Sequence, residues 1–171
     1  RALTEAGYLS VLIPEECGGS GLGISAAAAI MEEIQKSGCN GGACHAQMYT
    51  MGTVLRHGTD EQKQKYLPGI AAGELRMQAF GVTEPTSGTD TLSLRTTAVK
   101  NDAGDYVING QKIWTSRVEH SDLMLLLAPT QSKDEVEKRT EGLSVCLVDL
   151  RDAVCNGMDI KPIRTRLHQA T

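Results

Sequence analysis

The residues best suited to chemistry in this chain of 171 residues lie in one short stretch, FGVTEPTSGTD, at positions 80–90. Pro85 removes one backbone donor, while Gly81 and Gly88 permit unusual backbone angles and close approach to a ligand. The stretch also carries four hydroxyl groups, on Thr83, Thr86, Ser87 and Thr89. Such a loop can surround a flat ligand with many acceptors, but the same residue types are typical of a solvated connection between strands.

A second stretch, NGQKIWTS at positions 109–116, favours the ligand-binding interpretation. It contains the only tryptophan of the chain, Trp114. Thr115 and Ser116 follow directly and add two hydroxyl groups. An aromatic side chain beside hydroxyl groups suits a ring that both stacks and accepts hydrogen bonds.

The carboxylates of the first stretch are Glu84 and Asp90. Glu84 precedes a proline, and we interpret it as a hydrogen-bonded anchor of the loop rather than as a catalytic base. A zinc site at Cys39, Cys44 and His45 is disfavoured, because the spacing lacks a CxxC pair and a fourth ligand.

The first half of the chain alternates helical patterns with glycine-rich turns. ISAAAAIMEEIQKSG predicts a helix with Ser25 as its N-cap and Gly38 as its stop. Two further helices are predicted over ACHAQMYTMGTVLRHG and TDEQKQKYLPGIAAGE, the second capped by Thr59 or Asp60. GLGISA fits a dinucleotide fingerprint after the possible strand YLSVLI, but helices follow it instead of βαβ units. It is therefore interpreted as a turn before a helix.

After Gly73 the hydrophobic period changes to that of strands. Strands are predicted within the segments LRMQAFGV, LSLRTTAVK, DYVINGQKIW, DLMLLLAPT and GLSVCLVDL. Asn109 and Gly110 predict the turn of a hairpin. The charged segment QSKDEVEKRTEG is interpreted as a solvated surface loop. The expected fold class is α+β, with an all-α helical domain at 1–75 followed by an antiparallel, β-barrel-like domain at 76–171.

Composition narrows the functional classes. With 40% hydrophobic and 22% charged residues the chain can bury a core. A net charge of −4 without a run of basic residues disfavours nucleic acid as a partner, and no apolar stretch is long enough to span a bilayer. An odd number of cysteines, five, favours free thiols in a reducing compartment. Both ends interrupt patterns, so the chain is expected to be a truncated piece of a longer protein.

VTEPTSGTD and NGQKIWTS, following GTDEQKQKYLPGIAAGE in this order, resemble the acyl-CoA dehydrogenase family of flavoproteins. The resemblance covers essentially the whole chain, from AGYLSVLIPEECGGSGLG onward. It implies part of an N-terminal helical domain and the first part of a middle β domain. It also implies that a C-terminal helical domain, which carries the catalytic Glu beyond Thr171, is absent from this chain.

The resemblance implies a role for each residue that matches the family's motifs. The loop from Phe80 to Thr89 is expected to wrap FAD and the thioester end of the substrate, with Val82 and Thr83 donating toward the pyrimidine edge of the flavin. Thr89 stands where the family usually has Ser and is expected to contact the acyl-CoA. Trp114 is expected to pack against the isoalloxazine. WTS replaces the commoner WIT, so either Thr115 or Ser116 contacts flavin N5, and register favours Ser116.

The resemblance implies that the helix predicted over ACHAQMYTMGTVLRHG lies beside the family's acyl pocket. His45, Met48, Tyr49 and Met51 could therefore line an acyl channel. Met48 and Met51 could equally belong to the core, and His45 could simply lie on the helix face.

The implied activity is α,β-dehydrogenation of an acyl-CoA thioester to a trans-2-enoyl-CoA, as in fatty acid β-oxidation. Electron-transfer flavoprotein is the implied electron acceptor, and a homotetramer or homodimer is the implied assembly. The implied location is the cytoplasm of a bacterium or the mitochondrial matrix of a eukaryote. Alternatives are an acyl-CoA oxidase or flavin monooxygenase of the same fold, or a non-catalytic relative.

Overall fold

The structure is a computed structural model, and it describes residues 2–132 and 134–166. The chain divides into two units. Residues 1–79 with 120–123 form the first, and residues 80–119 with those from 124 onward form the second. The expected fold class is confirmed, because helices precede a β-sheet region.

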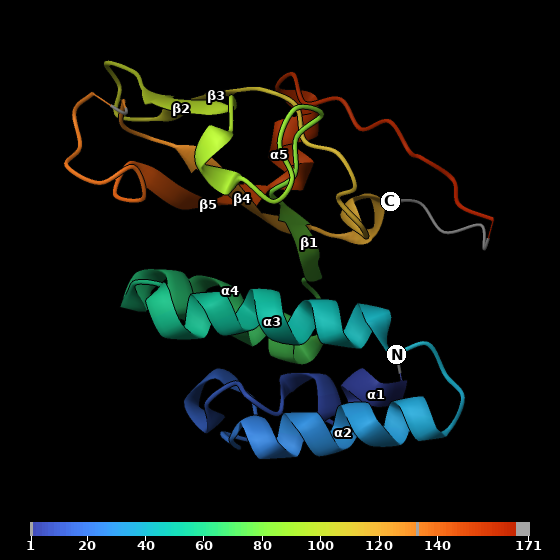
Figure 1. Cartoon of the computed structure of the whole chain (residues 1–171). Coiled ribbons are helices and arrows are strands. Elements are labelled where there is room, and N and C mark those ends of the chain that lie inside the picture. Colours follow the sequence, from blue (N-terminus) through green and yellow to red (C-terminus); the bar gives the residue numbers. More distant parts are fainter. Residues whose placement is uncertain (1, 133, 167–171) are drawn as a thin grey trace. The chain divides into compact units, whose positions relative to one another are not determined.

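The first unit is helical (Figure 1). Its α-helices are α1 (Ala2–Glu5), α2 (Ile24–Lys36), α3 (Gly42–His57) and α4 (Asp60–Ala72). Short 3-10 helices cover Tyr8–Ser10 and Glu15–Cys17. The predicted strand YLSVLI is therefore wrong: its first residues form a 3-10 helix instead, because Ser10 turns the chain by donating from Oγ to the carbonyl oxygen of Gly7 (3.1 Å).

Helix boundaries follow their local signals with one exception. Thr59 caps α4, and Gly38 has φ 77° just after α2, as predicted. The predicted cap at Ser25 is wrong, because α2 begins one residue earlier, at Ile24, and the extended backbone of Gly23 occupies the cap position. No side chain caps this helix.

The core of the helical unit is built mainly from α3 and α4. Met51, Leu67 and Ile70 are fully buried, and Met48 packs with Val11 and Ala27 of preceding segments. Burying each of these Met, Leu, Ile and Val side chains contributes on the order of 1.5–3 kcal/mol. Thr50 is also buried, and its hydroxyl donates to the carbonyl oxygens of Ala46 and Met77.

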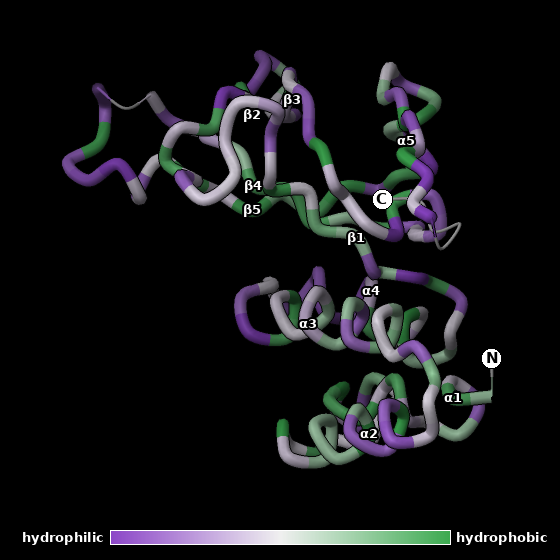
Figure 2. The backbone as a smooth tube through the Cα atoms, turned by 45° about the vertical axis from the view of Figure 1, so that its right-hand side comes forward, coloured by the Kyte–Doolittle hydropathy of each residue, from purple (hydrophilic) through white to green (hydrophobic). Residues whose placement is uncertain are grey.

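The strands are β1 (Met77–Gly81), β2 (Thr97–Lys100), β3 (Tyr106–Asn109), β4 (Leu123–Pro129) and β5 (Leu143–Asp149). Each lies within a segment predicted to contain a strand. The three-stranded sheet has the order β1-β4-β5, and β2 pairs with β3 in a separate sheet. The sheets of the described residues are thus not closed into a barrel. The central strand β4 is buried almost throughout, which explains its unbroken apolar run (Figure 2).

The hairpin predicted around Asn109 and Gly110 is wrong, because β3 pairs antiparallel with the preceding strand β2 and not with the residues after Gly110. The turn lies at 101–105, where the N–H of Asn101 donates to the Asp105 carbonyl (2.8 Å) and Gly104 has φ 91°. Gly110 instead follows the end of β3, and a Cβ built there would lie 2.7 Å from the Cα of Thr96. Gly110 is therefore required because the backbone of Thr96 lies close to it, and not because it forms a tight turn.

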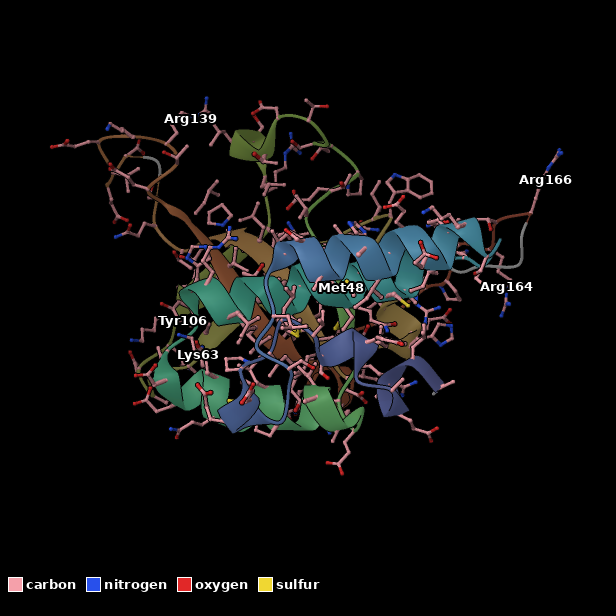
Figure 3. All side chains as sticks on the ribbon, turned by 90° about the horizontal axis from the view of Figure 1, so that it is seen from below. Met48, Lys63, Tyr106, Arg139, Arg164 and Arg166 are labelled. Carbon is pink, nitrogen blue, oxygen red and sulfur yellow. The ribbon has the colours of Figure 1, made fainter. Side chains whose placement is uncertain are left out.

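The charged segment at 131–142 connects β4 to β5 and is largely hydrophilic in Figure 2. It is mostly exposed where the structure describes it, as predicted for a solvated loop. Arg139 projects from this loop in Figure 3, and its Nη2 donates to the carbonyl oxygen of Leu92 (3.1 Å).

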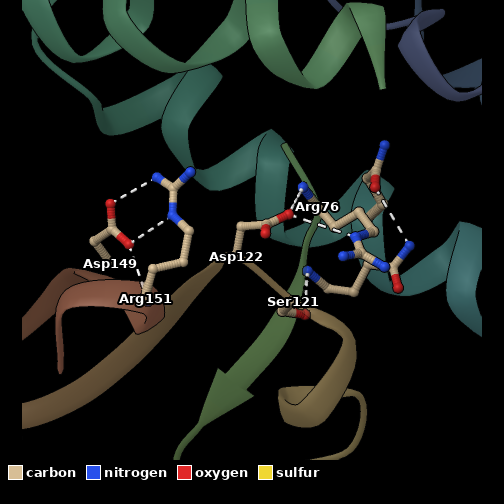
Figure 4. Close-up of polar contacts among 7 residues, drawn as sticks. Arg76, Ser121, Asp122, Asp149 and Arg151 are labelled. Carbon is tan, nitrogen blue, oxygen red and sulfur yellow. Dashed lines mark hydrogen bonds and ion pairs between the residues drawn. The ribbon is translucent and has the colours of Figure 1, made fainter. Parts of the chain in front are cut away.

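Polar contacts lie where β1 and β4 begin and where β5 ends (Figure 4). In the helical unit, Asp122 accepts from the backbone N–H of Arg76 (2.8 Å), and Ser121 Oγ accepts from the N–H of Gln78 (3.2 Å). In the β unit, Asp149 caps α5 (Leu150–Cys155) and pairs with Arg151 (2.7 Å). The Arg151 guanidinium holds the pKa of the Asp149 carboxyl below its usual range.

The cap of α4 gives a prediction for local stability. Thr59 Oγ1 accepts from the N–H of Gln62 (3.2 Å), and Gln62 Oε1 accepts from the N–H of Thr59 (2.9 Å). Thr59→Ala removes the cap, which typically costs about 1 kcal/mol. We expect amide exchange in the first turn of α4 to accelerate about fivefold by hydrogen-exchange mass spectrometry. Thr59→Ser, which keeps the hydroxyl, is the control; equal exchange in the Ala variant would contradict the cap's role.

Candidate functional site

The loop at 80–90 begins with the last two residues of β1 and then folds back on itself. The N–H of Glu84 donates to the Ser87 carbonyl (2.8 Å), and the N–H of Ser87 donates to the Glu84 carbonyl (3.1 Å). Ser87 Oγ donates to the carbonyl oxygen of Asp90, and the Asp90 carboxylate accepts from the N–H of Leu92 (3.2 Å). The turn-forming residues of the sequence therefore give this loop a defined backbone.

Glu84 anchors the loop, as predicted. Its side chain is buried and accepts from two successive backbone N–H groups, Arg95 to Oε2 (2.6 Å) and Thr96 to Oε1 (3.0 Å). Lys112 Nζ donates to Oε1 at 2.9 Å. Every contact of this carboxylate tethers the loop to residues that lie further along the chain.

The environment of Glu84 keeps it ionised. Burial raises the pKa of this carboxyl, but the neighbouring Thr96 hydroxyl, the Arg95 N–H, the Lys112 ammonium and the Thr96 N–H together lower it from 4.5 to about 2. A carboxylate with such a low pKa, already bound to several donors, is a poor proton acceptor. Glu84 is therefore unsuited to act as a base.

The structure brings the two predicted binding stretches together. The N–H of Ile113 donates to the carbonyl oxygen of Thr83 (2.8 Å), so the segment that carries Trp114 lies against the loop. Lys112 Nζ donates to the carbonyl oxygen of Val82 (3.0 Å). A Cβ built on Gly88 would lie 3.9 Å from Thr83 Cγ2. Gly88, which directly precedes Thr89, therefore lies beside Thr83.

The Trp114 segment has a strained backbone. Trp114 has φ 59° and Arg117 has φ 69°, in the left-handed region that non-glycine residues rarely occupy. Such a conformation costs on the order of 1–3 kcal/mol and is concentrated at ligand sites. The Trp114 side chain is 56% exposed although it is large and apolar. Both features are typical of a residue placed to meet a ligand.

The other predicted site residues differ in accessibility. Thr115 is buried and Ser116 is exposed, which is compatible with Ser116 being the hydroxyl that meets a ligand. Phe80 lies in β1 and is half-buried. Val82 and Thr83 are also half-buried, whereas Thr89 is exposed. The assignment of these residues to a cofactor or substrate stays a prediction.

On α3, two of the proposed acyl-channel residues belong to the core. Met48 (labelled in Figure 3) and Met51 are buried, whereas Tyr49 is partly exposed and packs its ring 5.2 Å from that of His45. Among the described residues no group of three or more His, Cys, Asp or Glu side chains could hold a metal ion. In the same residues no helix is long and apolar enough to cross a membrane.

Sequence reasoning missed Lys112. Its ammonium is almost fully buried, with the side chain 9% exposed. Lys112 is the basic residue of NGQKIWTS, but the sequence does not show that Glu84 is buried and requires a charged partner, so the pair becomes visible only in the structure.

Comparison with known proteins identifies the family. The family model described as "Acyl-CoA dehydrogenase, N-terminal domain" matches residues 1–74, and "Acyl-CoA dehydrogenase, middle domain" matches residues 79–169. Together these matches cover almost the whole chain. The chain therefore belongs to the acyl-CoA dehydrogenase family.

Individual relatives agree with the family models. The acyl-CoA dehydrogenase FadE26 of Mycobacterium tuberculosis is 42% identical over 66% of this chain and 27% of its own length. The solved structure of the Tcur3481-Tcur3483 steroid ACAD is 35% identical, with a TM-score of 0.83 over 99% of this chain and 42% of that one. Butyryl-CoA dehydrogenase from Megasphaera elsdenii is 28% identical, with a TM-score of 0.74 over 86% of this chain. The chain spans less than half the length of these relatives.

The donors of the loop fit a flavin. Within residues 2–132 and 134–166, neither the backbone N–H nor the hydroxyl of Thr83 has a hydrogen-bond partner. The pyrimidine edge of a flavin presents carbonyl oxygens that such donors can meet. Thr83 would hold this edge and Trp114 would meet the ring, as the resemblance implies.

The depressed pKa of Glu84 predicts how stability depends on pH. Because the folded-state pKa lies below the unfolded value of 4.5, the ionised carboxylate stabilises the fold above pH 4.5. This contribution, about 3 kcal/mol for a shift of this size, is lost as the pH falls from 4.5 toward 2. Denaturant midpoints of the full-length protein should therefore drop between pH 6 and pH 3.

Glu84→Gln should reduce that drop, since the amide does not titrate. The exposed Glu119→Gln is the matched control and should retain the full pH dependence. An unchanged pH dependence in Glu84→Gln would show that this carboxylate does not control acid stability.

Proposed function

We propose that the full-length protein containing this chain is an FAD-dependent acyl-CoA dehydrogenase that converts an acyl-CoA thioester to a trans-2-enoyl-CoA. The observation that carries the proposal is the contact between the loop at 80–90 and the Trp114 segment. It brings Thr83, whose donors have no hydrogen-bond partner among the described residues, beside the segment that carries the exposed Trp114. Membership of the family supports the same function.

The residues of this chain would bind and orient the cofactor and the substrate. Thr83 would donate toward the pyrimidine edge, which favours a negatively charged reduced ring. Trp114 would cover the ring and exclude water, and Ser116 would place its hydroxyl at N5. Thr89 would hold the acyl-CoA, its extra methyl group distinguishing it from the family's usual Ser. FAD, when bound, accepts the hydride that leaves the β carbon.

The proton α to the thioester must go to a base outside these contacts. Glu84 already accepts several hydrogen bonds and its pKa is lowered to about 2, which makes it a poor proton acceptor. The base is therefore proposed to be a Glu of the C-terminal helical domain. The thioester must be bound close to both the base and the cofactor, so that the proton can leave its α carbon while the hydride leaves its β carbon. The middle domain would thus set the geometry of a reaction that other parts of the protein complete.

Partners of the whole protein follow from the same proposal. Electron-transfer flavoprotein would reoxidise the flavin, and the protein would assemble as a homotetramer or homodimer. The substrate would be a fatty or related acyl-CoA, in the bacterial cytoplasm or the mitochondrial matrix.

The activity is tested with the full-length protein under anaerobic conditions. The isolated protein should carry FAD, and its visible absorbance should bleach when a suitable acyl-CoA thioester is added. A panel of short, medium, branched and steroid-side-chain thioesters would identify the preferred acyl group. A flavin that stays oxidised with every thioester would contradict the proposed reaction.

The same preparation in air distinguishes a dehydrogenase from an oxidase. A dehydrogenase should release little hydrogen peroxide during turnover without an electron acceptor. Stoichiometric peroxide would identify an oxygen-using relative instead.

The position of Trp114 is tested by fluorescence. Adding FAD to the full-length apoprotein should quench tryptophan emission, since a ring in contact with the flavin transfers its excitation. The quenched component should be missing from Trp114→Phe, which keeps an aromatic ring and should still bind FAD. Identical quenching in the two proteins would place Trp114 away from the cofactor.

A further inference from the structure

Lys112 has two acceptors on the same loop, although its ammonium is almost fully buried. Nζ donates to the carboxylate of Glu84 at 2.9 Å and to the carbonyl oxygen of Val82 at 3.0 Å. The aliphatic part packs against Gly81, where a built Cβ would lie 3.4 Å from Lys112 Cγ. A buried ammonium that donates to two acceptors, on a side chain packed against Gly81, has little freedom to change its direction.

The contact with Val82 determines the direction of a neighbouring donor. The carbonyl of Val82 and the N–H of Thr83 belong to one planar trans peptide, in which they point in opposite directions. A contact that fixes the direction of the Val82 carbonyl therefore also fixes the direction of the Thr83 N–H. That N–H has no hydrogen-bond partner among the described residues, so it is available to a ligand.

The next peptide of the loop is fixed in another way. The carbonyl of Thr83 accepts from the N–H of Ile113, and the N–H of Glu84 donates to the Ser87 carbonyl. Backbone contacts hold that plane at both ends. The Val82–Thr83 plane, by contrast, is held by the Lys112 side chain.

Charge strengthens this arrangement. An ammonium that donates to a carbonyl polarises the peptide, which makes the N–H on its far side a stronger donor. Glu84 balances the ammonium and holds it in place through one shared oxygen. The pair is neutral overall, so its effect on a ligand passes through the peptide and not through a net charge.

We propose that Lys112 is a positioning residue that aims and polarises the Thr83 N–H toward the pyrimidine edge of the flavin, with Glu84 holding its ammonium in place. The inference rests on the proposed function, because it requires that FAD bind at this loop. Lys112 itself does not touch the cofactor. It acts through the Val82–Thr83 peptide.

Four variants of the full-length protein separate positioning from stability: Lys112→Met, Glu84→Gln, the double variant and Lys112→Arg. Lys112→Met leaves Glu84 as a buried charge without its ammonium, which destabilises the fold. The double variant removes both charges and should regain stability. Lys112→Arg keeps a charged donor that can reach the Val82 carbonyl. The exposed Lys100→Met, in the same unit, is the control.

Three properties are measured on each protein: the melting temperature of the apoprotein, the dissociation constant for FAD, and the reduction potential of the bound flavin. Lys112→Met and the double variant should both bind FAD about tenfold more weakly, as expected for a hydrogen bond that depends on a charged group. Both should shift the potential to more negative values, because a weaker donor stabilises the reduced ring less. Lys112→Arg should keep most of both properties. Glu84→Gln should lose part of each, because a neutral amide holds the ammonium less firmly than a carboxylate does.

The double variant decides the question. If Lys112 merely stabilised the fold, FAD affinity and potential would return together with the melting temperature in that variant, and the proposal would be overturned. Persisting cofactor defects in a protein of restored stability are the expected result. A wild-type protein that binds no FAD would overturn the proposed function itself, an outcome visible before any variant is made.

Discussion

The hydrogen bonds of the buried Glu84 carboxylate hold together the segments that form the proposed ligand-binding region of the β unit. Glu84 is 4% exposed and accepts hydrogen bonds from residues that follow it by 11, 12 and 28 positions. A buried charge requires this degree of compensation, and leaving it unpaired would cost several kcal/mol. The loop, the start of β2 and the Trp114 segment therefore take defined positions relative to one carboxylate.

This anchoring explains how a loop of small polar residues can be specific. Glycine and hydroxyl residues alone would give a mobile connection, whose ordering on ligand binding would cost free energy. The Glu84–Lys112 pair, the Ser87 turn and the Ile113 contact order the loop in advance. A left-handed backbone at Trp114 is tolerated within this framework. The region thus combines a rigid base with an exposed, donor-rich surface.

Patterns of local origin were readable in the sequence, and contacts between distant segments were not. Helical period and the Thr59 cap located α4, and the change of period located the strands. The turn was misplaced because the Asn109–Gly110 pair has the chemistry of a tight turn, whereas Gly110 is required by the approach of Thr96. The anchoring role of Glu84 was predicted from its place before Pro85 and from its match to a structural position of the family motif. Its partner Lys112 depends on tertiary structure, which no local pattern encodes.

The most direct test is a crystal structure of the full-length protein with FAD bound. The account predicts that the backbone N–H of Thr83 lies within about 3 Å of an acceptor on the pyrimidine edge, while Lys112 still contacts the Val82 carbonyl. Trp114 should lie against the ring. A flavin bound away from this loop, or a Val82–Thr83 peptide turned so that its carbonyl faces the cofactor, would contradict it.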